Sequence, residues 1–374
     1  MNIIVDGRAF VKTAAGITNF LKCSLRELAK QLPNYRFIVV LPKQLHPSLE
    51  NLDMPGNVQF KVYETKWSNK IPNFIWLQII LPFIVRKYKA KLYYSPVPYI
   101  PFFLPSHITK LIVVHDVVNL EYKSTMAFGN RISSAMYFER SIKKADFIWT
   151  NSNYTKEKVN KYIPNRKCND IYVGDSAERE LYHKIVLTDD KVNDLKKALG
   201  IKDRFLMFVG SLEPRKNLSF LLNLMPELFK RYNYQLLVVG GKGWKENNIK
   251  DIVMASGYPK DSTIFAGYIT NEQLAMLYNI ADCFVSTSLN EGFGMPQLEA
   301  MLCGCPVVTA DNSAMKELAE NEHTAITVSG WKEEDWVQTI HKTIESGYKP
   351  NVQNLKKYDW KIIVHNLLMR IKLS

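Results

Sequence analysis

Short apolar runs alternate with helix-like segments along the first half of the chain. The apolar runs have the length and composition of buried strands and cover residues 3–6, 35–41, 58–62, 91–95, 111–115 and 146–151. Helical periodicity appears between them, at residues 18–31, 74–87 and 128–144. This alternation constrains the fold strongly, because parallel strands need a crossover connection that is usually a helix. It predicts an α/β fold built on a doubly wound parallel sheet.

The same alternation starts again in the second half. Strands are expected at residues 205–210, 235–240, 263–266, 282–287 and 306–309, and helices at residues 217–231, 249–256 and 271–279, the last with Asn271 as its N-cap. The charged stretch 175–202 between the halves has few strand signals. A chain of 374 residues is also long for one domain. We therefore expect two domains, at residues 1–185 and 186–358, followed by a terminal helix within residues 359–374.

Charge is distributed unevenly between the two halves. Residues 1–185 contain 27 Lys and Arg against 14 Asp and Glu, a net charge of +13, whereas residues 186–374 contain 22 of each and carry none. A basic half-molecule implies an anionic partner surface. Because no nucleic-acid-binding motif is recognisable, we favour an anionic membrane surface over nucleic acid as that partner.

Any contact with a membrane is expected to be peripheral. The most apolar stretch, residues 71–85, is shorter than the roughly 20 residues that span a bilayer. Its helical part is expected to pack mainly in the core, with basic residues on either side at Lys66, Lys70, Arg86, Lys87, Lys89 and Lys91. The chain enters its first strand directly, without a signal peptide, and its five cysteines suggest no disulfide framework. The expectation is a cytoplasmic protein that contacts the inner face of the cytoplasmic membrane.

A glycine-rich turn joins one predicted strand of the second half to the next helix. Gly292 and Gly294 keep side chains out of this turn, and Pro296 suits the first position of the helix. Backbone N–H groups exposed at a helix N-terminus favour an anion. Glu291 and Glu299 place carboxylates before and after the turn, and carboxylates accept hydrogen bonds from hydroxyl groups. The pattern predicts a site for a phosphorylated, hydroxyl-rich ligand.

The two glutamates are separated by seven residues that include the sequence Gly-Phe-Gly-Met-Pro. With Ala300-Met301 after them, this spacing resembles the donor-site signature of the retaining GT-B glycosyltransferases of family 4, also called group 1, and in particular mannosyltransferases of the surface-polysaccharide type. The resemblance implies two Rossmann-like domains facing across a cleft, with a C-terminal helix that crosses back to the first domain. It also implies contacts with sugar hydroxyls for Glu291, with ribose for Glu299, and with the donor phosphates for Gly292, Phe293 and Gly294.

Residues at other predicted strand ends extend the same resemblance. In relatives, a lysine after the first strand of the second domain contacts the diphosphate, which implies this role for Lys216 and the neighbouring Arg215. His115 ends a strand of the first half and is implied to lie near the transferred sugar, with Asp116 as a further site residue or a cap. Gly16 is implied near the donor phosphate, and a plain turn is the alternative there. The nucleoside is expected near Gly240, Tyr268 and Ile269.

The resemblance implies transfer of a sugar from a nucleoside diphosphate sugar, with retained anomeric configuration, to a glycan or polyprenyl-diphosphate-linked acceptor. Mannose or a deoxysugar is favoured, and His115 and Glu291 are the implied catalytic residues. The chain has no Asp-x-Asp pair, and Cys303-Gly304-Cys305 has no second pair to complete a zinc site. Neither a metal nor a cofactor is therefore expected. Two alternatives remain open: a nucleotide-sugar epimerase of GT-B type, and an inactive relative that serves as a binding or scaffold subunit.

Overall fold

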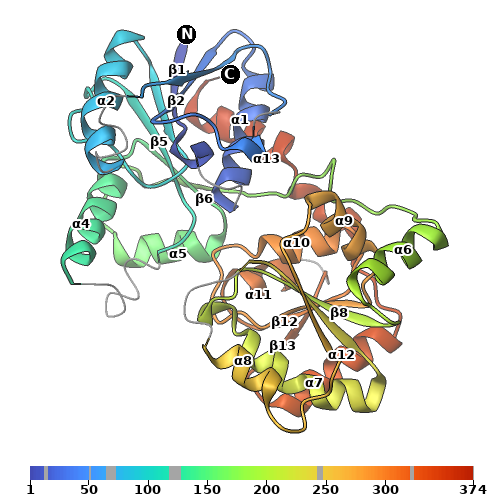
Figure 1. Ribbon diagram of the computed structural model, residues 1–374. Coiled ribbons are helices and arrows are strands. Elements are labelled where there is room, and N and C mark those ends of the chain that lie inside the picture. The colour runs from blue at the N-terminus through green and yellow to red at the C-terminus, as the bar shows by residue number, and fades with distance from the viewer. Residues whose placement is uncertain are drawn as a thin grey trace. The chain divides into compact units, whose positions relative to one another are not determined.

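The computed structural model describes residues 1–11, 16–49, 52–64, 73–117, 128–241, 247–320 and 324–373. The chain divides into two compact units: unit 1 comprises Met1–Asp175 and Tyr358–Ser374, and unit 2 comprises Ser176–Lys357. The division falls before the boundary that we expected at residue 185. Each unit is a parallel sheet with helices packed against it (Figure 1). The predicted α/β fold with two doubly wound halves is confirmed.

Unit 1 contains a parallel sheet with the strand order β3-β2-β1-β4-β5-β6-β7. The chain moves outward from β1 through β2 to β3, then returns to place β4 on the other side of β1. The order therefore reverses between β1 and β4, which is where ligands bind in open α/β sheets. The strands are β1 (Asn2–Asp6), β2 (Arg36–Leu41), β3 (Val58–Val62), β4 (Leu92–Ser95), β5 (Thr109–Val114), β6 (Phe147–Thr150) and β7 (Ile171–Val173).

Both faces of this sheet are buried by helices. Successive residues of β1 point to opposite faces, so Ile3 and Val5 join one apolar cluster and Ile4 joins the other. This explains why the strands read as continuous apolar runs in the sequence. The α-helices of unit 1 are α1 (Gly16–Gln31), α2 (Asn73–Lys87), α4 (Phe128–Lys144), α5 (Asn153–Tyr162) and α13 (Trp360–Ile371).

Helix α13 belongs to unit 1 although the chain forms it after all of unit 2. It lies beside α1 (Figure 1). The Trp360 ring meets the ring of Phe20 edge-on, with centroids 5.2 Å apart, and the Tyr172 hydroxyl donates to the Ile363 carbonyl at 2.6 Å. The last helix therefore completes one face of the first sheet.

Unit 2 contains a parallel sheet with the strand order β10-β9-β8-β11-β12-β13, which reverses between β8 and β11. Its strands are β8 (Phe205–Val209), β9 (Gln235–Val239), β10 (Thr263–Gly267), β11 (Cys283–Ser286), β12 (Val307–Ala310) and β13 (Ile326–Val328). Its α-helices are α6 (Asp189–Leu199), α7 (Leu218–Tyr232), α8 (Asn247–Met254), α9 (Asn271–Ile280), α10 (Met295–Leu302), α11 (Ser313–Glu320) and α12 (Glu333–Glu345).

Two predicted helix starts in unit 2 are wrong by one residue. The N-cap of α9 is Thr270 rather than Asn271: the Thr270 hydroxyl accepts from the Gln273 N–H, and the Gln273 side chain accepts from the Thr270 N–H. This reciprocal capping box satisfies two backbone donors, more than Asn271 could satisfy alone. Helix α10 begins at Met295, with Gly294 as its N-cap, so Pro296 occupies the second position.

Within the described ranges, no helix combines the length and apolar character that crossing a bilayer requires.

Candidate functional site

The loops that follow β8 and β11 carry the main candidate residues, because these strands are neighbours at the reversal point of the unit 2 sheet. After β8, the short helix Pro214–Lys216 presents Arg215 and Lys216. After β11 comes the glycine-rich turn with Glu291. The two loops are tied together, since the Leu289 N–H donates to the Arg215 carbonyl at 2.8 Å and the Thr287 hydroxyl donates to the Asn217 carbonyl at 3.0 Å.

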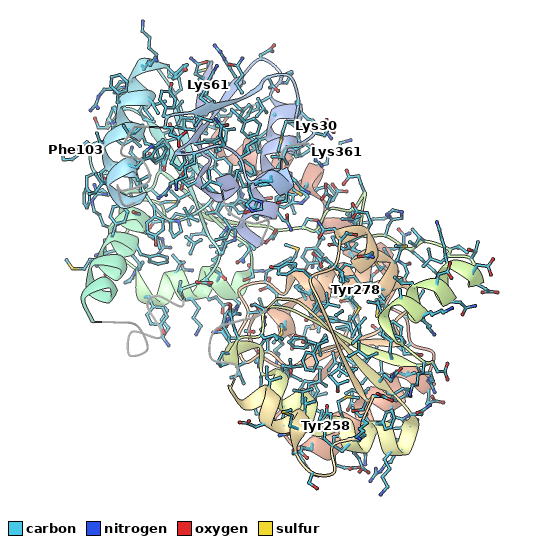
Figure 2. The ribbon with its side chains drawn as sticks, in the orientation of Figure 1. Lys30, Lys61, Phe103, Tyr258, Tyr278 and Lys361 are labelled. Carbon is cyan, nitrogen blue, oxygen red and sulfur yellow. The ribbon has the colours of Figure 1, made fainter. Side chains whose placement is uncertain are left out.

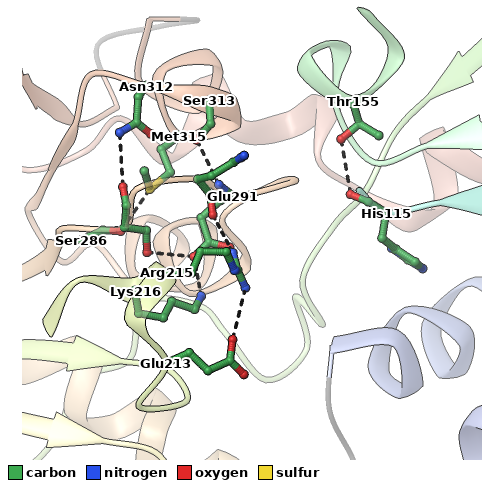
Figure 3. A network of polar contacts seen from close by, with 12 residues as sticks. His115, Thr155, Glu213, Arg215, Lys216, Ser286, Glu291, Asn312, Ser313 and Met315 are labelled. Atoms are coloured by element: carbon green, nitrogen blue, oxygen red, sulfur yellow. Dashed lines mark hydrogen bonds and ion pairs between the residues drawn. The ribbon is translucent and has the colours of Figure 1, made fainter. Parts of the chain in front are cut away.

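Glu291 is the centre of this site (Figure 3). Its carboxylate accepts from Arg215 Nη1 at 2.8 Å and from Ser288 Oγ at 2.8 Å, and it forms an ion pair with Lys216. The side chains of Glu291 and Lys216 are each 12% exposed. Burial opposes ionisation of this carboxyl, but the charges and hydrogen bonds of Lys216 and Arg215 outweigh it and lower the pKa of Glu291 to about 2. The carboxylate is therefore ionised throughout the physiological range.

The backbone of Glu291 is held from the β12 side of the sheet by residues that the sequence analysis missed. The Glu291 N–H donates to Ser313 Oγ at 3.1 Å, and Ser313 Oγ donates to Asn312 Oδ1 at 2.9 Å. Asn312 in turn donates to the Ser288 carbonyl at 3.3 Å. Serine and asparagine are common in ordinary turns, so no sequence signal distinguished Ser288, Asn312 and Ser313.

The turn into α10 leaves the helix N-terminus without a capping side chain. Gly294 has a φ of 94°, in the left-handed region that favours glycine. A Cβ added at Gly294 would lie 3.4 Å from Leu318 Cδ1, an ordinary van der Waals contact, so the backbone conformation and not the packing favours glycine here. Phe293 beside it is buried. One residue missed from sequence is Gln297, whose buried Oε1 has no hydrogen-bond partner among the described residues.

Lys216, Ser288, Glu291, Gly294 and Gln297 line one small pocket with residues of β8 and β11. The pocket combines the Lys216 ammonium, the Glu291 carboxylate, the N-terminus of α10 and the side-chain carbonyl oxygen of Gln297. Such a set offers donors to phosphate oxygens and acceptors to hydroxyl groups.

Glu299 lies one turn into α10 and is almost fully buried. Its Oε2 accepts from the Tyr278 hydroxyl at 3.3 Å. Burial raises the pKa of Glu299 to about 7, because the single hydrogen bond from Tyr278 compensates the lost hydration only in part. Unlike Glu291, this carboxyl exchanges its proton near neutral pH.

The expected nucleoside residues lie at the ends of β9 and β10. Gly240 has a φ of 144°, and a Cβ there would lie 2.0 Å from the Gly210 carbonyl oxygen, so only glycine fits. The Tyr268 side chain is 77% exposed, and a Cβ on Gly241 would lie 2.4 Å from its ring. Tyr268 therefore leaves much of its ring open to solvent, and Ile269 follows it.

His115 follows β5 in unit 1. Its Nε2 lies 2.9 Å from the Pro96 carbonyl, which can only accept, so Nε2 carries the proton and Nδ1 is an acceptor. Burial lowers the pKa of His115, which keeps the imidazole neutral. Asp116 beside it is exposed, and Gly16 begins α1, where an added Cβ would have no described atom within 4 Å. The described residues therefore impose no packing requirement for glycine at Gly16.

Within the described ranges, no group of three or more His, Cys, Asp or Glu side chains is placed to hold a metal ion. The cysteines at positions 23, 168, 283, 303 and 305 are buried free thiols.

Comparisons with known proteins find similarity in both sequence and fold. Residues 191–360 match the family described as glycosyl transferases group 1. The chain is 28% identical over 245 residues to the serotype-specific mannosyltransferase WbdA of Escherichia coli, covering 62% of this chain and 28% of WbdA. It is 27% identical over 249 residues to the O-antigen chain mannosyltransferase B of Escherichia coli, covering 63% of this chain and 60% of that protein. In both, the match spans less than two thirds of the relative.

Solved structures share the fold across the whole chain at low identity. Sucrose-phosphate synthase of Thermosynechococcus elongatus superposes with a TM-score of 0.77 and 16% identity, covering 100% of this chain and 98% of that one. HepE of Anabaena, solved in complex with UDP-glucose, has a TM-score of 0.75 and 18% identity, with 100% of both chains covered. At these identities the likeness shows the fold alone.

Proposed function

We propose that this chain, which has the GT-B fold and whose residues 191–360 match the family of glycosyl transferases group 1, is a retaining glycosyltransferase. It transfers a sugar from a nucleoside diphosphate sugar to a glycan or a polyprenyl-diphosphate-linked acceptor in surface-polysaccharide synthesis. The names of its relatives favour mannose as the sugar, with a deoxysugar as the second choice. The observation that carries the proposal is the cluster of Glu291, Arg215 and Lys216 at the reversal point of the unit 2 sheet.

In this proposal the donor binds along the ends of the unit 2 strands. Arg215, Lys216 and the N-terminus of α10, through Gly292, Phe293 and Gly294, hold the diphosphate. Glu299 accepts from the ribose hydroxyls. The base lies against the open ring of Tyr268, with Ile269 and Gly240 beside it. For Gly16 of unit 1 the family resemblance implies a role near the donor phosphate.

The chemistry needs stabilisation of the negative charge that develops on the leaving diphosphate. Fixed cations and backbone N–H groups supply it without reorganisation, so the reaction requires no metal. Glu291 accepts from sugar hydroxyls and orients the oxocarbenium-like sugar. For His115 the family resemblance implies a place near the transferred sugar, and a neutral imidazole with Nδ1 as an acceptor suits that role. The acceptor attacks from the face that the leaving group departs from, and its proton passes to the leaving phosphate.

The test is a screen of the purified protein against UDP-, GDP- and dTDP-sugars with a polyprenyl-diphosphate-linked glycan as acceptor, in the presence and absence of EDTA. We expect one donor to give a product with retained anomeric configuration, and activity to survive EDTA. A product of inverted configuration would contradict the retaining mechanism. Loss of activity in EDTA that manganese restores would contradict the metal-free site. Nucleotide binding without turnover of any donor would instead favour the inactive binding subunit.

A further inference from the structure

Helix α2 of unit 1 carries an apolar stripe on the side that faces solvent. Its opposite face is buried in the core through residues such as Leu77, Leu81 and Ile84. The exposed stripe consists of Ile75, Ile79 and Phe83, which are 42%, 61% and 61% exposed. These residues are four positions apart, so they lie along one side of the helix. Only the face with Leu77, Leu81 and Ile84 packs in the core. The stripe on the other face has no packing partner in the described part of unit 1.

A loop after β4 extends this stripe with two more aromatic side chains. Phe102 and Phe103 are 44% and 68% exposed, and Figure 2 shows Phe103 projecting outward beside α2. Arg86 Nη2 of α2 donates to the Phe103 carbonyl at 3.1 Å. The Phe102 N–H donates to Gln78 Oε1 of α2 at 2.6 Å. The loop and the helix therefore form one continuous surface.

Helix α4 joins this surface from the other side of the loop. The Arg140 guanidinium lies over the Phe102 ring, 4.0 Å from its centroid, and Met136 of the same helix is 66% exposed. We call the whole set the apolar patch, and its members are Ile75, Ile79, Phe83, Phe102, Phe103 and Met136. Hydrogen bonds and the Arg140 guanidinium over the Phe102 ring hold the aromatic part of the patch in place. The exposure of these side chains is therefore a feature of the fold.

Charge around the apolar patch has one sign. The sequence contains no Asp or Glu between Glu64 and Asp116, although seven Lys and Arg occur in that interval. Arg86, Lys87 and Lys89 follow the stripe directly and are all exposed, whereas Lys66 and Lys70 lie outside the described residues. Helix α4 ends in Lys143 and Lys144, and its one acidic residue, Glu139, is paired with Lys143 at 2.6 Å.

From this combination we propose that the apolar patch and its basic rim dock unit 1 on an anionic lipid bilayer. The apolar side chains enter the boundary between head groups and acyl chains, and the cations contact lipid phosphates. The charge of the rim favours this occupant, because a margin in which cations outnumber carboxylates attracts a surface of many negative head groups. Docking on a bilayer does not require sugar transfer, so its test does not depend on the proposed function.

The experiment is co-sedimentation of the full-length chain with phosphatidylcholine vesicles and with vesicles that also contain phosphatidylglycerol. One variant removes apolar side chains (Ile79→Ser, Phe83→Ser, Phe103→Ser), and a second removes charge (Lys87→Gln, Lys89→Gln). Control variants change exposed residues elsewhere: Val186→Ser with Met254→Ser, which are 97% and 84% exposed and so more exposed than the patch residues, and Lys30→Gln with Lys361→Gln. Nucleotide binding and circular dichroism check that every variant is folded.

We expect binding to anionic vesicles only, weakened by salt, at least tenfold lower in both patch variants and unchanged in both controls. Equal loss in the controls would show that general charge or apolarity drives binding, and would overturn the proposal. Absence of binding by the wild-type chain would overturn it too. A dimer in solution that the apolar variant abolishes, without vesicle binding, would assign the patch to a second copy of the chain instead.

Discussion

The carboxylate of Glu291 forms ion pairs with both cations that would hold the diphosphate of the proposed donor. Arg215 and Lys216 both contact Glu291, and Lys216 is largely buried with it. If the donor binds as proposed, its diphosphate competes with this carboxylate for the two cations and leaves Glu291 able to accept from the sugar. The proposed binding of the phosphates and the proposed positioning of the sugar would then be coupled through one side chain.

This coupling predicts opposite effects of Glu291→Gln on binding and on turnover. The variant removes the internal anion that competes for Arg215 and Lys216, so a nucleoside diphosphate should bind about tenfold more tightly, or about 1.4 kcal/mol. Transfer should nevertheless be lost, because the amide orients the sugar less well. Calorimetric titration and a product assay measure the two effects. Glu213→Gln is the control, since its carboxylate lies 4.0 Å from Arg215 without contacting Lys216. Unchanged or weaker affinity in Glu291→Gln would refute the competition.

The proposed ribose contact of Glu299 predicts that nucleotide binding depends on pH. In the proposed site the ribose hydroxyls donate to the ionised carboxylate, but burial raises the pKa of Glu299 to about 7. Binding should therefore release about half a proton at pH 7, and affinity should rise between about pH 6 and pH 8. Calorimetry in two buffers of different ionisation enthalpy measures this release. Because the nucleotide itself titrates, the comparison is with Glu299→Gln, which should lose the protein's share of the release. The same release in both proteins would exclude Glu299 as the ribose acceptor.

The two glutamates also affect stability in opposite directions. The pKa of Glu299 rises on folding from an ordinary value near 4.5, so the folded chain keeps a proton that the unfolded chain loses, and this contribution weakens as pH rises from 4.5 to about 7. The pKa of Glu291 falls on folding to about 2, so its contribution is complete above about pH 5 and is lost as pH falls towards 2.

At the level of helices and strands, the sequence predicted the long apolar elements well and the short ones poorly. Strands β7 and β13 have three residues each, too few for an apolar pattern to stand out from loops. Helix α6 lies in the charged stretch between the halves and buries none of its residues, so it had no apolar stripe to reveal it. The sequence does contain two boundary signals for this helix, the polar N-cap Thr188 and the C-cap Gly200.

Candidate site residues were predictable one by one, but their contacts were not. Arg215 and Glu291 are far apart in the sequence and meet because β8 and β11 are neighbours in the sheet. Periodicity predicts that strands exist, whereas the order in which they pair depends on long-range packing. Residues that support Glu291, such as Ser313, could not be predicted for the same reason. Ser313 reaches the Glu291 backbone only because β12 lies next to β11.

The capping box of α9 gives a test at the level of one helix. Thr270→Ala should cost about 1 kcal/mol of unfolding free energy, because it leaves the Gln273 N–H without its side-chain acceptor. Asn271→Ala, one residue later, should change stability by much less. Urea unfolding of both variants gives the comparison. An equal or larger loss in Asn271→Ala would mean that Asn271 is the effective cap.

At the level of the whole molecule, the two units are not two consecutive pieces of chain. Unit 1 is built from the beginning of the chain and from α13, whereas unit 2 is continuous. Helix α13 contributes a group of buried apolar side chains to the core of unit 1, namely Trp360, Ile363, Val364, Leu367, Leu368 and Ile371.

Deleting residues 358–374 should therefore destabilise unit 1 selectively. Each large apolar side chain that loses its burial costs about 1.5–3 kcal/mol, so the loss of α13 should remove the cooperative unfolding of unit 1. Unit 2 should keep its hydrogen-exchange protection and its affinity for a nucleoside diphosphate. Exchange measured by mass spectrometry distinguishes the units. Equal loss of protection in both units would show that they unfold as one cooperative body.

The position of α13 has a consequence for the order in which the protein forms on the ribosome. Phe20 and Trp149 are synthesised early, but the helix that covers them emerges only after the whole of unit 2 has been made. Unit 2 is complete in itself as soon as Lys357 has left the exit tunnel. Unit 1 is therefore begun before unit 2 but completed after it, and its aromatic residues Phe20 and Trp149 lack the cover of α13 until that helix has been synthesised.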